Sequence, residues 1–288
     1  MSLNGYQENS LKKLQRKVLP FIYRKDLRKL ATFYGTDKWN SHWYAQHYNK
    51  HFAPLRLKKL NILEIGVGGD DDPKSGGESL RMWKTYFPNS MIYGIDIVDK
   101  KALEEPRIKI FQGSQDDESF LRKVVAETGE LDIIIDDGSH INEHVIKSFK
   151  ILFPALKHGG IYVIEDTLTS YVPDINELKF VSEGVVKKWP QLGGSLDLNS
   201  PNTMVNFFKK LVDCLNYQEF FKPGYSPSYF DQHIVAMHFY HNLVILYKEK
   251  NNEGGFYLEN NTLKPHVLKY LGIDSLDDMG LKIPLLSE

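Results

Sequence analysis

Apolar residues along the chain follow two different spacings, which predicts strands separated by helices. Short apolar runs of strand length recur from residue 60 onward, and the stretches between them carry apolar residues at helical spacing. We expect strands over residues 60–65, 91–97 and 107–113 and in the runs that begin at residues 131 and 160. The helices between them are expected over residues 79–87, 118–128 and 142–152. Strands and helices in alternation predict an α/β fold with a mostly parallel sheet.

The later part of the chain departs from this alternation. Residues 233–240 and 243–248 predict a β-hairpin that closes the sheet antiparallel. Residues 172–232 form a long insertion with one clear helix, which we expect Ser200 to cap. The buried face expected for this helix consists of Val205, Phe208, Leu211, Val212 and Leu215. Long insertions commonly cover active sites, so we expect a substrate lid here.

The first fifty residues predict helices rich in basic and aromatic side chains. Residues 10–33 predict two helices interrupted near Pro20, with one apolar stripe. That stripe comprises Leu11, Leu14, Val18, Phe21 and Ile22. The segment 33–52 predicts a turn at 35–38, which could serve as a ligand loop, and an amphipathic helix. We expect this helix to pack Trp43, Tyr44, Tyr48 and Phe52. His47 and His51 have the i, i+4 spacing of a metal site, but no acid lies between them, which favours simple packing.

Composition and charge exclude several classes of function. Lysines and arginines number 36 and aspartates and glutamates 37, so the net charge of −1 provides no overall basic field for nucleic acid. A local basic stretch does occur between residues 12 and 29, where eight Lys or Arg residues accompany one acid. The only cysteine is Cys214, which excludes an intrachain disulfide and fits a cytoplasmic location. No apolar run reaches 18 residues, so we expect no membrane partner.

Acidic residues gather where two of the predicted strands end. The run from Leu131 to His140 reads LDIIIDDGSH, an apolar strand that ends in Asp136, Asp137, Ser139 and His140. The next strand ends in the same way, with Glu165 and Asp166. Ligands of open α/β sheets bind beyond the carboxyl ends of the strands, so these side chains fall where the chemistry is expected. If the two strands are neighbours, their carboxylates share one edge of the sheet.

A glycine-rich turn after the first strand predicts a cofactor loop. Its sequence, EIGVGG, runs from Glu64 to Gly69 and lets the backbone approach a ligand closely. It lacks the GxGxxG spacing of dinucleotide sites, and the acids at 70–72 would repel a pyrophosphate, which argues against NAD. Asp96 ends the second strand, where a carboxylate can accept both hydroxyls of a ribose. After the third strand, Gln115, Asp116 and Asp117 either reach an adenine ring or cap the following helix.

Five ordered segments carry a family resemblance. They read ILEIGVGG, SLRMWKTYFPNSMIYGIDI, FQGSQDD, DDGSHI and GGIYVIEDT, and the match around them covers roughly residues 31–171. In this order they closely resemble the magnesium-dependent sugar O-methyltransferases of macrolide biosynthesis that use S-adenosylmethionine. The resemblance implies a Rossmann-like, class I methyltransferase fold with a seven-stranded sheet, a homo-oligomer and a small-molecule glycoside as acceptor. The region after residue 171 matches less clearly.

The same resemblance implies roles for individual residues. The expected cofactor-binding residues are Glu64, Gly66, Gly68, Asp96, Gln115, Asp116, Asp117 and Asp136, of which Asp136 either contacts the cofactor or supports its neighbour. The expected ligands of Mg²⁺ are Asp137, Glu165 and Asp166, and the expected general base is His140. The expected organisation is an N-terminal helical segment (1–55), a methyltransferase domain (56–250) that contains the lid (172–232), and a peripheral tail (251–288).

This chemistry is physically reasonable for an alcohol acceptor. A hydroxyl is a poor nucleophile, and coordination to a cation makes its proton easier to remove. Three carboxylates suit a hard, oxygen-seeking ion such as Mg²⁺, and two adjacent sugar hydroxyls could chelate it. An imidazole such as that of His140 can accept the proton near neutral pH.

Three alternatives stay open. The first is a metal-dependent O-methyltransferase for catechols or other small molecules, and the second is an NAD-linked oxidoreductase, which the glycine spacing disfavours. The third is a non-catalytic interaction protein that binds S-adenosylmethionine and uses its basic helices on RNA or an acidic partner. The presence of all four polar residues Asp137, His140, Glu165 and Asp166 argues against a non-catalytic role.

Overall fold

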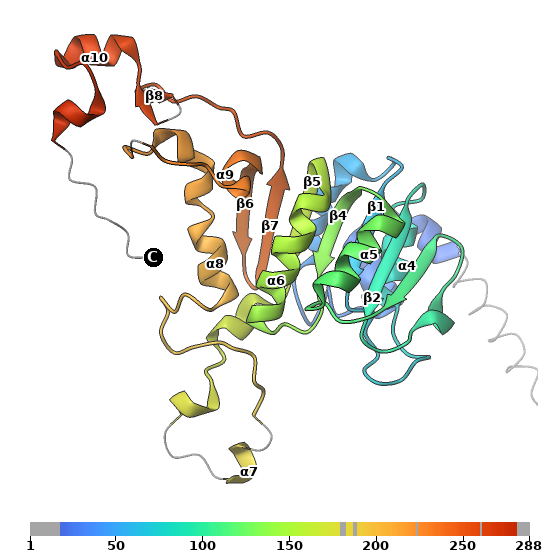
Figure 1. The fold of residues 1–288 in the computed structure, drawn as a ribbon. Coiled ribbons are helices and arrows are strands. Elements are labelled where there is room, and N and C mark those ends of the chain that lie inside the picture. Colours follow the sequence, from blue (N-terminus) through green and yellow to red (C-terminus); the bar gives the residue numbers. More distant parts are fainter. Residues whose placement is uncertain (1–17, 179–182, 187–188, 223, 260, 281–288) are drawn as a thin grey trace, which may run out of the picture.

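The centre of the molecule is a seven-stranded sheet, seen in the ribbon of Figure 1. This computed structural model describes residues 18–178, 183–186, 189–222, 224–259 and 261–280. The strands are β1 (Asn61–Ile65), β2 (Met91–Asp96), β3 (Ile108–Gln112), β4 (Leu131–Asp136), β5 (Leu156–Ile164), β6 (Ile234–Tyr240) and β7 (Leu243–Lys248). Their spatial order is β3-β2-β1-β4-β5-β7-β6. The first five strands are parallel and β7 is antiparallel to both neighbours, which confirms the predicted sheet and hairpin.

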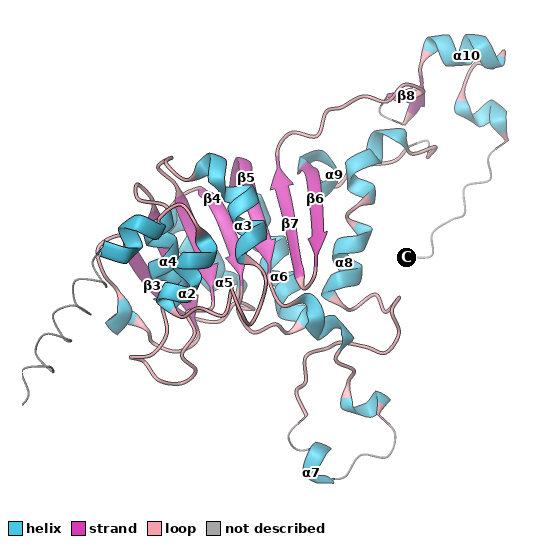
Figure 2. Cartoon of the chain, turned by 180° about the vertical axis from the view of Figure 1, so that it is seen from behind, coloured by secondary structure: helices cyan, strands magenta, loops and turns pink. Residues whose placement is uncertain are grey.

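Helices cover both faces of the sheet, as Figures 1 and 2 show from opposite sides. The α-helices are α2 (Leu27–Tyr34), α3 (Ala45–Phe52), α4 (Glu78–Tyr86), α5 (Glu118–Thr128), α6 (Asn142–Leu152), α7 (Glu183–Val186), α8 (Met204–Lys210), α9 (Tyr229–His233) and α10 (Pro265–Leu271). Short 3-10 helices lie at Ala53–Leu55, Lys101–Leu103, Phe153–Ala155, Thr167–Tyr171, Ile175–Glu177, Asp213–Glu219 and Leu276–Met279. The helices expected over 118–128 and 142–152 match α5 and α6 at both ends.

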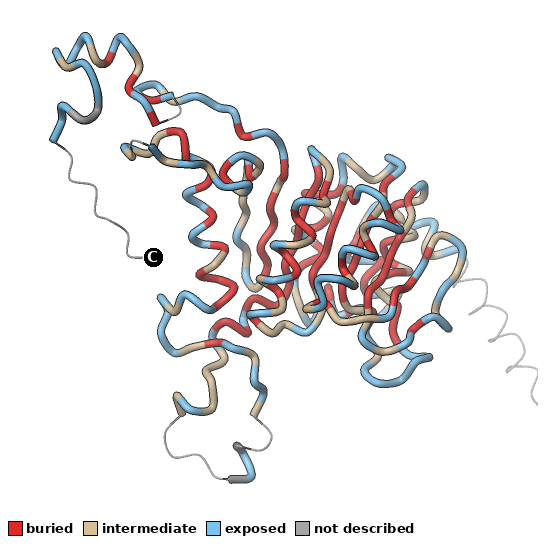
Figure 3. The backbone as a smooth tube through the Cα atoms, in the orientation of Figure 1, coloured by how far each residue is buried: buried red, intermediate tan, exposed pale blue. Residues whose placement is uncertain are grey.

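The core has two apolar layers, one on each face of the sheet. Helices α2, α3 and α4 contribute Leu30, Tyr48 and Trp83 to one layer. Helices α6 and α8 contribute Phe149 and Phe208 to the other. Figure 3 shows the buried residues concentrated in the strands between these layers. Since α2 and α3 share their layer with the sheet, this part of the N-terminal segment is built into the core.

The strand order brings the ends of β1, β4 and β5 side by side. Asp136 pairs with Ile65 of β1 on one side and with Ile164 of β5 on the other. The neighbouring position expected for the two acid-bearing strands is therefore confirmed. Beyond the sheet the same contact continues, because the Asp137 amide donates to Ile65 O at 3.0 Å.

The N-terminal expectations are partly wrong. Residues 18–23 are helical through Pro20, and the break lies instead at residues 24–26. The reason is Asp26, whose side chain accepts from the amides of Arg28 and Lys29 and so begins α2. Leu11 and Leu14 lie outside the described residues, while the rest of the expected apolar stripe, Val18, Phe21 and Ile22, is exposed. Of the expected aromatic face of α3, Tyr44, Tyr48 and Phe52 are buried but Trp43 is exposed.

The insertion helix begins later than predicted. Thr203, not Ser200, caps α8, because its side chain accepts from the Asn206 amide. The Ser200 carbonyl instead accepts from the side-chain amide of Asn206 at 2.7 Å. Val212, expected inside, is 38% exposed because α8 ends at Lys210.

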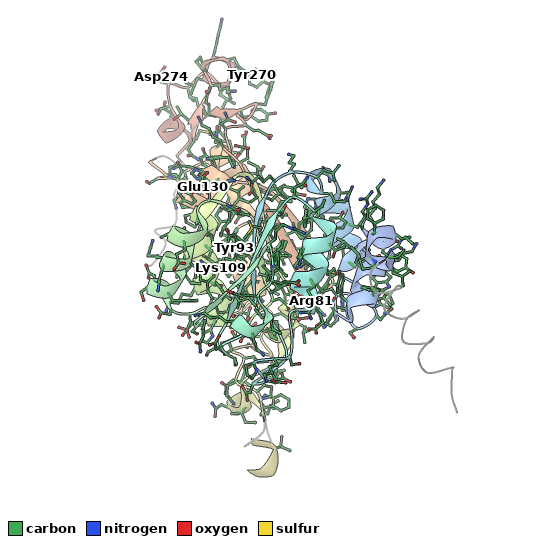
Figure 4. All side chains as sticks on the ribbon, turned by 90° about the vertical axis from the view of Figure 1, so that its right-hand side faces the viewer. Arg81, Tyr93, Lys109, Glu130, Tyr270 and Asp274 are labelled. Carbon is green, nitrogen blue, oxygen red and sulfur yellow. The ribbon has the colours of Figure 1, made fainter. Side chains whose placement is uncertain are left out.

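The edges of the molecule differ in how they are protected. Figure 4 looks onto edge strand β3, where Lys109 lies beside the neighbouring strand's Tyr93. Lys109 pairs with Glu127 at 3.0 Å, and a charged side chain discourages further strand pairing at this edge. At the other end, the hairpin of β8 (Leu258–Glu259) and β9 (Thr262–Leu263) packs with α10 in a small separate apolar cluster. Figures 1 and 4 show this tail standing away from the sheet. In the described part of the chain, no helix is long and apolar enough to cross a membrane.

We predict that Phe149→Ala destabilises the fold far more than a matched exposed substitution. Phe149 is fully buried and its ring contacts those of Tyr162, Phe208 and Phe230. The cavity left by the ring should lower the free energy of unfolding by about 3–5 kcal/mol. Phe256→Ala, at a side chain that is 72% exposed, should cost less than about 0.5 kcal/mol. Urea denaturation of both variants measures this, and equal losses would contradict the assigned core.

Candidate functional site

A cavity of about 770 Å³ lies at the carboxyl ends of the parallel strands. Its volume is in the range of about 300–1,000 Å³ that is usual for ligand sites. Six of the residues expected from the sequence line it: Gly66, Gly68, Asp96, Gln115, Asp137 and His140. They come from the loops after β1, β3 and β4 and from the end of β2. The topology therefore assembles in one place side chains that are up to 74 positions apart, 140 − 66, in the sequence.

The glycine loop after β1 packs closely against the loop after β4. Gly66 has φ +93°, and a Cβ atom there would lie 2.0 Å from the Asp137 carbonyl oxygen. Gly68 also has a positive φ, but nothing lies within 4 Å of its Cβ position. Only glycine satisfies both the backbone angle and the close approach at position 66. The loop thus has a fixed shape, with open space above Gly68.

Asp96 is held at the cavity by backbone amides. Its two carboxylate oxygens accept from Val67 N at 3.0 Å and from Val98 N at 2.9 Å. Each oxygen keeps a further lone pair, so the carboxylate can still accept from the hydroxyls of a ribose. This is the geometry expected for a ribose-binding acid.

Asp136 lies beneath the cavity and does not line it. Its carboxylate accepts from Ser148 Oγ at 2.6 Å and from Gln115 Nε2 at 3.1 Å. Gln115 Oε1 in turn accepts from the Ser139 amide at 2.6 Å, which ties together the loops after β3 and β4. Burial raises the pKa of Asp136 to about 6. Of the two roles considered for Asp136, the geometry favours support of its neighbours.

Besides Asp136, three other residues expected at the cofactor do not line the cavity. Asp117 caps α5, since its Oδ1 accepts from the amides of Ser119 and Phe120, so the capping alternative holds for this residue. The Asp116 carboxylate accepts a hydrogen bond from the Ser114 hydroxyl. Glu64 is fully buried within β1 and accepts from Ser79 Oγ at 2.7 Å. The carboxylates of Asp116 and Asp117 thus have partners within the protein, whereas Glu64 Oε1 has no hydrogen-bond partner among the described residues and faces Lys38 Nζ at 3.3 Å. The cofactor contacts expected of these residues stay predictions.

A cluster that could bind a cation borders the cavity. Asp137, His140 and Asp166 each offer a ligand atom within 4.8 Å of the others, and His140 Nε2 lies 3.7 Å from Asp166 Oδ2. His140 and Asp166 have positive φ angles of 55° and 50°. Such backbone angles are uncommon for residues with a side chain and concentrate at functional sites. Two carboxylates beside an open cavity fit the requirements of a hard divalent cation.

Glu165, the third expected metal ligand, points to a different partner. Its Oε1 accepts from Lys38 Nζ at 2.6 Å and from the Tyr48 hydroxyl. Lys38 is fully buried and also donates to Asp137 Oδ2 at 2.7 Å. The expected single set of three carboxylates is thus divided, with Asp166 near His140, Glu165 on Lys38, and Asp137 adjoining both. Burial alone would lower the pKa of Lys38, but the facing carboxylates, Asp137 foremost, outweigh it and raise the pKa.

Several residues at this centre were not found from the sequence. Tyr44 donates to Asp166 Oδ1 at 2.6 Å, and His42 Nδ1 lies 3.6 Å from the same oxygen. Burial raises the pKa of Tyr44, which keeps the phenol protonated as a donor. Two features of the sequence could have indicated these residues: the turn at 35–38 and the many aromatic side chains that follow it. Thr36 of that turn lines the cavity, while Lys38, two residues later, turns inward to the acids.

His51 has a structural role, as the sequence predicted. Its ring nitrogens bond the hydroxyls of Tyr247, at 2.6 Å, and Tyr240, at 2.8 Å. Burial lowers its pKa to about 4, so the ring is neutral at physiological pH.

The insertion does not contribute to the cavity. None of its residues within 172–178, 183–186, 189–222 and 224–232 lines the cavity, and its role as a lid stays a prediction.

Comparison with known proteins reveals close relatives among enzymes that methylate antibiotics. The mycinamicin VI 2''-O-methyltransferase of Micromonospora griseorubida is 43% identical over 235 residues, which are 81% of this chain and 55% of that protein. The demethylmacrocin O-methyltransferase of Streptomyces fradiae is 45% identical over the same shares. A tetracenomycin-C rhamnosyl 3'-O-methyltransferase of Streptomyces olivaceus is 41% identical over 80% of this chain and 55% of its own. The chain thus spans about half the length of the relatives it matches. No family model matches the chain.

Solved structures agree with the sequence comparison. The MycE methyltransferase of the mycinamycin biosynthetic pathway, in complex with Mg and SAH, superimposes with a TM-score of 0.72 at 43% identity, over 80% of this chain and 55% of that one. The same enzyme in complex with Mg, SAH and mycinamycin VI gives a TM-score of 0.69 at 41% identity, over 80% and 56%. Over four fifths of its length, the chain is therefore homologous to the sugar O-methyltransferases of macrolide biosynthesis and shares their Rossmann-like methyltransferase fold.

Proposed function

We propose that the chain is an S-adenosylmethionine-dependent, magnesium-dependent O-methyltransferase that acts on a sugar hydroxyl of a glycosylated small molecule. The observation that carries this proposal is the position of the Asp137, His140 and Asp166 cluster at the border of the cavity that Gly66 and Asp96 line. The acceptor class is supported by relatives named as O-methyltransferases of mycinamicin VI, of demethylmacrocin and of a rhamnosyl tetracenomycin-C.

The cavity suits the cofactor in size and in chemistry. S-adenosylmethionine supplies an electrophilic methyl group on its sulfonium. Asp96 would accept from the ribose hydroxyls, because its oxygens have lone pairs to spare after bonding two amides. The Gly66–Gly68 loop would lie along the methionine part, where the absence of side chains allows close approach.

The cluster suits Mg²⁺. Its carboxylates would bind the ion, and its histidine would accept the proton. When bound, Mg²⁺ supplies positive charge that makes coordinated hydroxyls easier to deprotonate. Asp137 and Asp166 would hold the ion, and Tyr44 keeps the Asp166 carboxylate in place. His140 lines the cavity and would accept the hydroxyl proton at Nε2, which lies 3.7 Å from Asp166 Oδ2. Glu165, the third ligand expected from the family resemblance, contacts Lys38 in this structure, and its role as a ligand stays a prediction.

Calorimetry and a transfer assay together test the proposal. S-adenosylhomocysteine should bind at micromolar concentration, with NAD as the negative control ligand. Methyl transfer from labelled S-adenosylmethionine should then be measured with glycosides and with aromatic diols, each with and without EDTA. EDTA-sensitive methylation of a glycoside would support the proposal. Methylation of aromatic diols alone would favour the catechol-type alternative, and binding without any transfer would favour a non-catalytic role.

Assembly and location are further parts of the proposal. We infer a homo-oligomer from the family resemblance and a cytoplasmic location from the single cysteine, Cys214, which is buried. Sedimentation of the purified chain tests the first inference. A purely monomeric chain at micromolar concentration would contradict it.

We predict that Gly66→Ala weakens S-adenosylhomocysteine binding by at least about tenfold, which corresponds to about 1.4 kcal/mol. The new Cβ would collide with the Asp137 carbonyl and displace the cofactor loop. Gly129→Ala is the matched control, because Gly129 also has a positive φ but open space around it. Calorimetric dissociation constants of both variants provide the measurement. Equal affinity in Gly66→Ala and Gly129→Ala would show that the loop does not contact the cofactor.

We predict that His140→Ala lowers kcat by about 10²–10⁴-fold, the usual contribution of a general base. Affinity for S-adenosylhomocysteine should not change, because the imidazole acts on the acceptor. His158→Ala, at an exposed ring paired with Glu249, is the control and should retain full activity. Steady-state kinetics and calorimetry distinguish the two effects. A His140→Ala variant with wild-type kcat would remove His140 as the base.

We predict that Asp166→Asn raises the Mg²⁺ concentration needed for half-maximal activity by at least about tenfold. The amide removes negative charge from the cluster but preserves the shape of the side chain. Asp213→Asn, at an exposed acid far from the cluster in the sequence, should leave the Mg²⁺ requirement unchanged. Titration of activity with Mg²⁺ measures both. An unaltered requirement in Asp166→Asn would exclude this carboxylate as a metal ligand.

A further inference from the structure

Lys100 is a fully buried lysine that the proposed chemistry does not use. It directly precedes the short 3-10 helix Lys101–Leu103, which follows β2. Its Nζ donates to four backbone carbonyl oxygens of the loop between β1 and α4. These acceptors are Asp72 O at 2.7 Å, Asp70 O at 2.8 Å, Gly69 O at 3.2 Å and Ser75 O at 3.2 Å. We call these four oxygens the carbonyl ring.

The carbonyl ring forms because the two sides of the loop touch each other. A Cβ atom at Gly69 would lie 2.2 Å from the Ser75 carbonyl oxygen, so the backbones are in direct contact there. At the base of the loop, the Gly77 amide donates to Val67 O at 2.7 Å. Carbonyl dipoles that point to one place repel each other, and a cation between them removes the repulsion, as in the filters of ion channels. The ring is therefore stable only with a cation inside it.

The outer part of this loop has few other attachments to the protein. Residues 70–75 are all exposed, and Pro73 is the only apolar side chain among them. Asp70 also has a positive φ of 44°, which is unfavourable for a residue with a side chain. Segments with so little buried apolar surface open easily. The contact of its carbonyls with Lys100 is thus the main link between the outer loop and the interior.

We propose that Lys100 is a positioning residue, whose ammonium holds residues 69–75 in the shape that forms one wall of the cofactor cavity. The loop contributes Gly68, Asp70 and Asp71 to the lining of that cavity, whereas Lys100 does not line it. Lys100 therefore acts on the ligand only through the loop. The inference rests on the proposed function, because that function makes this cavity the site of S-adenosylmethionine.

Amide hydrogen exchange of the ligand-free protein tests the attachment of the loop without reference to the cofactor. Lys100→Ala should raise the exchange rates of the Ser75 and Gly77 amides, which donate within the loop, by at least about tenfold. The Leu121 amide of α5 should keep its wild-type rate. Lys101→Ala, at the exposed neighbouring lysine, is the matched control and should change neither region. Unchanged exchange of the loop in Lys100→Ala, or an equal increase in α5, would overturn the proposal.

A second variant covers the case in which Lys100→Ala folds poorly. Methionine keeps most of the length and buried apolar surface of the lysine side chain but has no charge and no hydrogen to donate. Lys100→Met should therefore show the same local increase in exchange as Lys100→Ala. A folded Lys100→Met variant with wild-type exchange in the loop would overturn the proposal.

Addition of a small ammonium ion should restore what the truncation removes. Ethylammonium fits the space that Lys100→Ala leaves and can donate to the same carbonyl oxygens, so it should return the exchange of the loop toward the wild-type rate. Tetramethylammonium has the same charge but no N–H group, and it should have no such effect. A purely structural role of the lysine side chain would show no difference between the two ions. Equal effects of both ions on Lys100→Ala would overturn the assignment of Lys100 to the carbonyl ring.

Calorimetry connects the loop to the cofactor. Lys100→Ala should bind S-adenosylhomocysteine at least about tenfold more weakly than the wild type, because the open loop must first be ordered, and ethylammonium should recover most of this loss. Lys101→Ala should bind as the wild type does. Wild-type affinity in a Lys100→Ala variant whose loop exchanges faster would overturn the proposal. Wild-type protein that binds no S-adenosylhomocysteine would contradict the proposed function instead, and hydrogen exchange alone would then decide whether Lys100 holds the loop.

Discussion

The interaction on which the site depends is the buried contact of the Lys38 ammonium with the carboxylates of Glu64, Asp137 and Glu165. Charges inside a protein are tolerated only when they are paired, so none of these groups could stay in place without the others. The contact joins the turn before α3 to the ends of β1, β4 and β5. It thus fixes the aromatic segment, which follows the turn, against the sheet edge, and it determines which face of Asp137 is left for a ligand.

The order of the strands in the sheet also determines where the parts of the site lie. The order β2-β1-β4-β5 puts the glycine loop, Asp96 and the acidic cluster along one edge. The loops there are tied to one another, since Gln115 bonds both Asp136 and the Ser139 amide. Positive φ angles at His140 and Asp166 store local strain that the packing around them must balance. A rigid cavity beside a compact acidic centre is the arrangement that cation-assisted transfer to a hydroxyl requires.

Much of the fold could be predicted from the sequence because local patterns determined it. The apolar runs identified every strand of the large sheet, and a cap at Asp116 or Asp117 was one of the two alternatives for the residues before α5, where Asp117 is the cap. The break between the N-terminal helices was predicted at Pro20 but lies just before Asp26. The side chain of Asp26 caps α2 and so determines where this helix begins. The site was predictable where strand ends carry acids, as at Asp137 and Asp166. Lys38 was not found, because its role depends on contacts 99 and 127 residues away that no local pattern encodes.

The most direct measurement of the central claim is the crystal structure of the chain with S-adenosylhomocysteine and Mn²⁺, with the metal located by its anomalous scattering. The account predicts one peak beside Asp137 and Asp166, close to His140, and the ligand's ribose on Asp96. A metal peak away from Asp137 and Asp166, or no peak at all, would contradict the account of the acidic centre. A ligand bound away from Gly66 and Asp96 would contradict the account of the cavity.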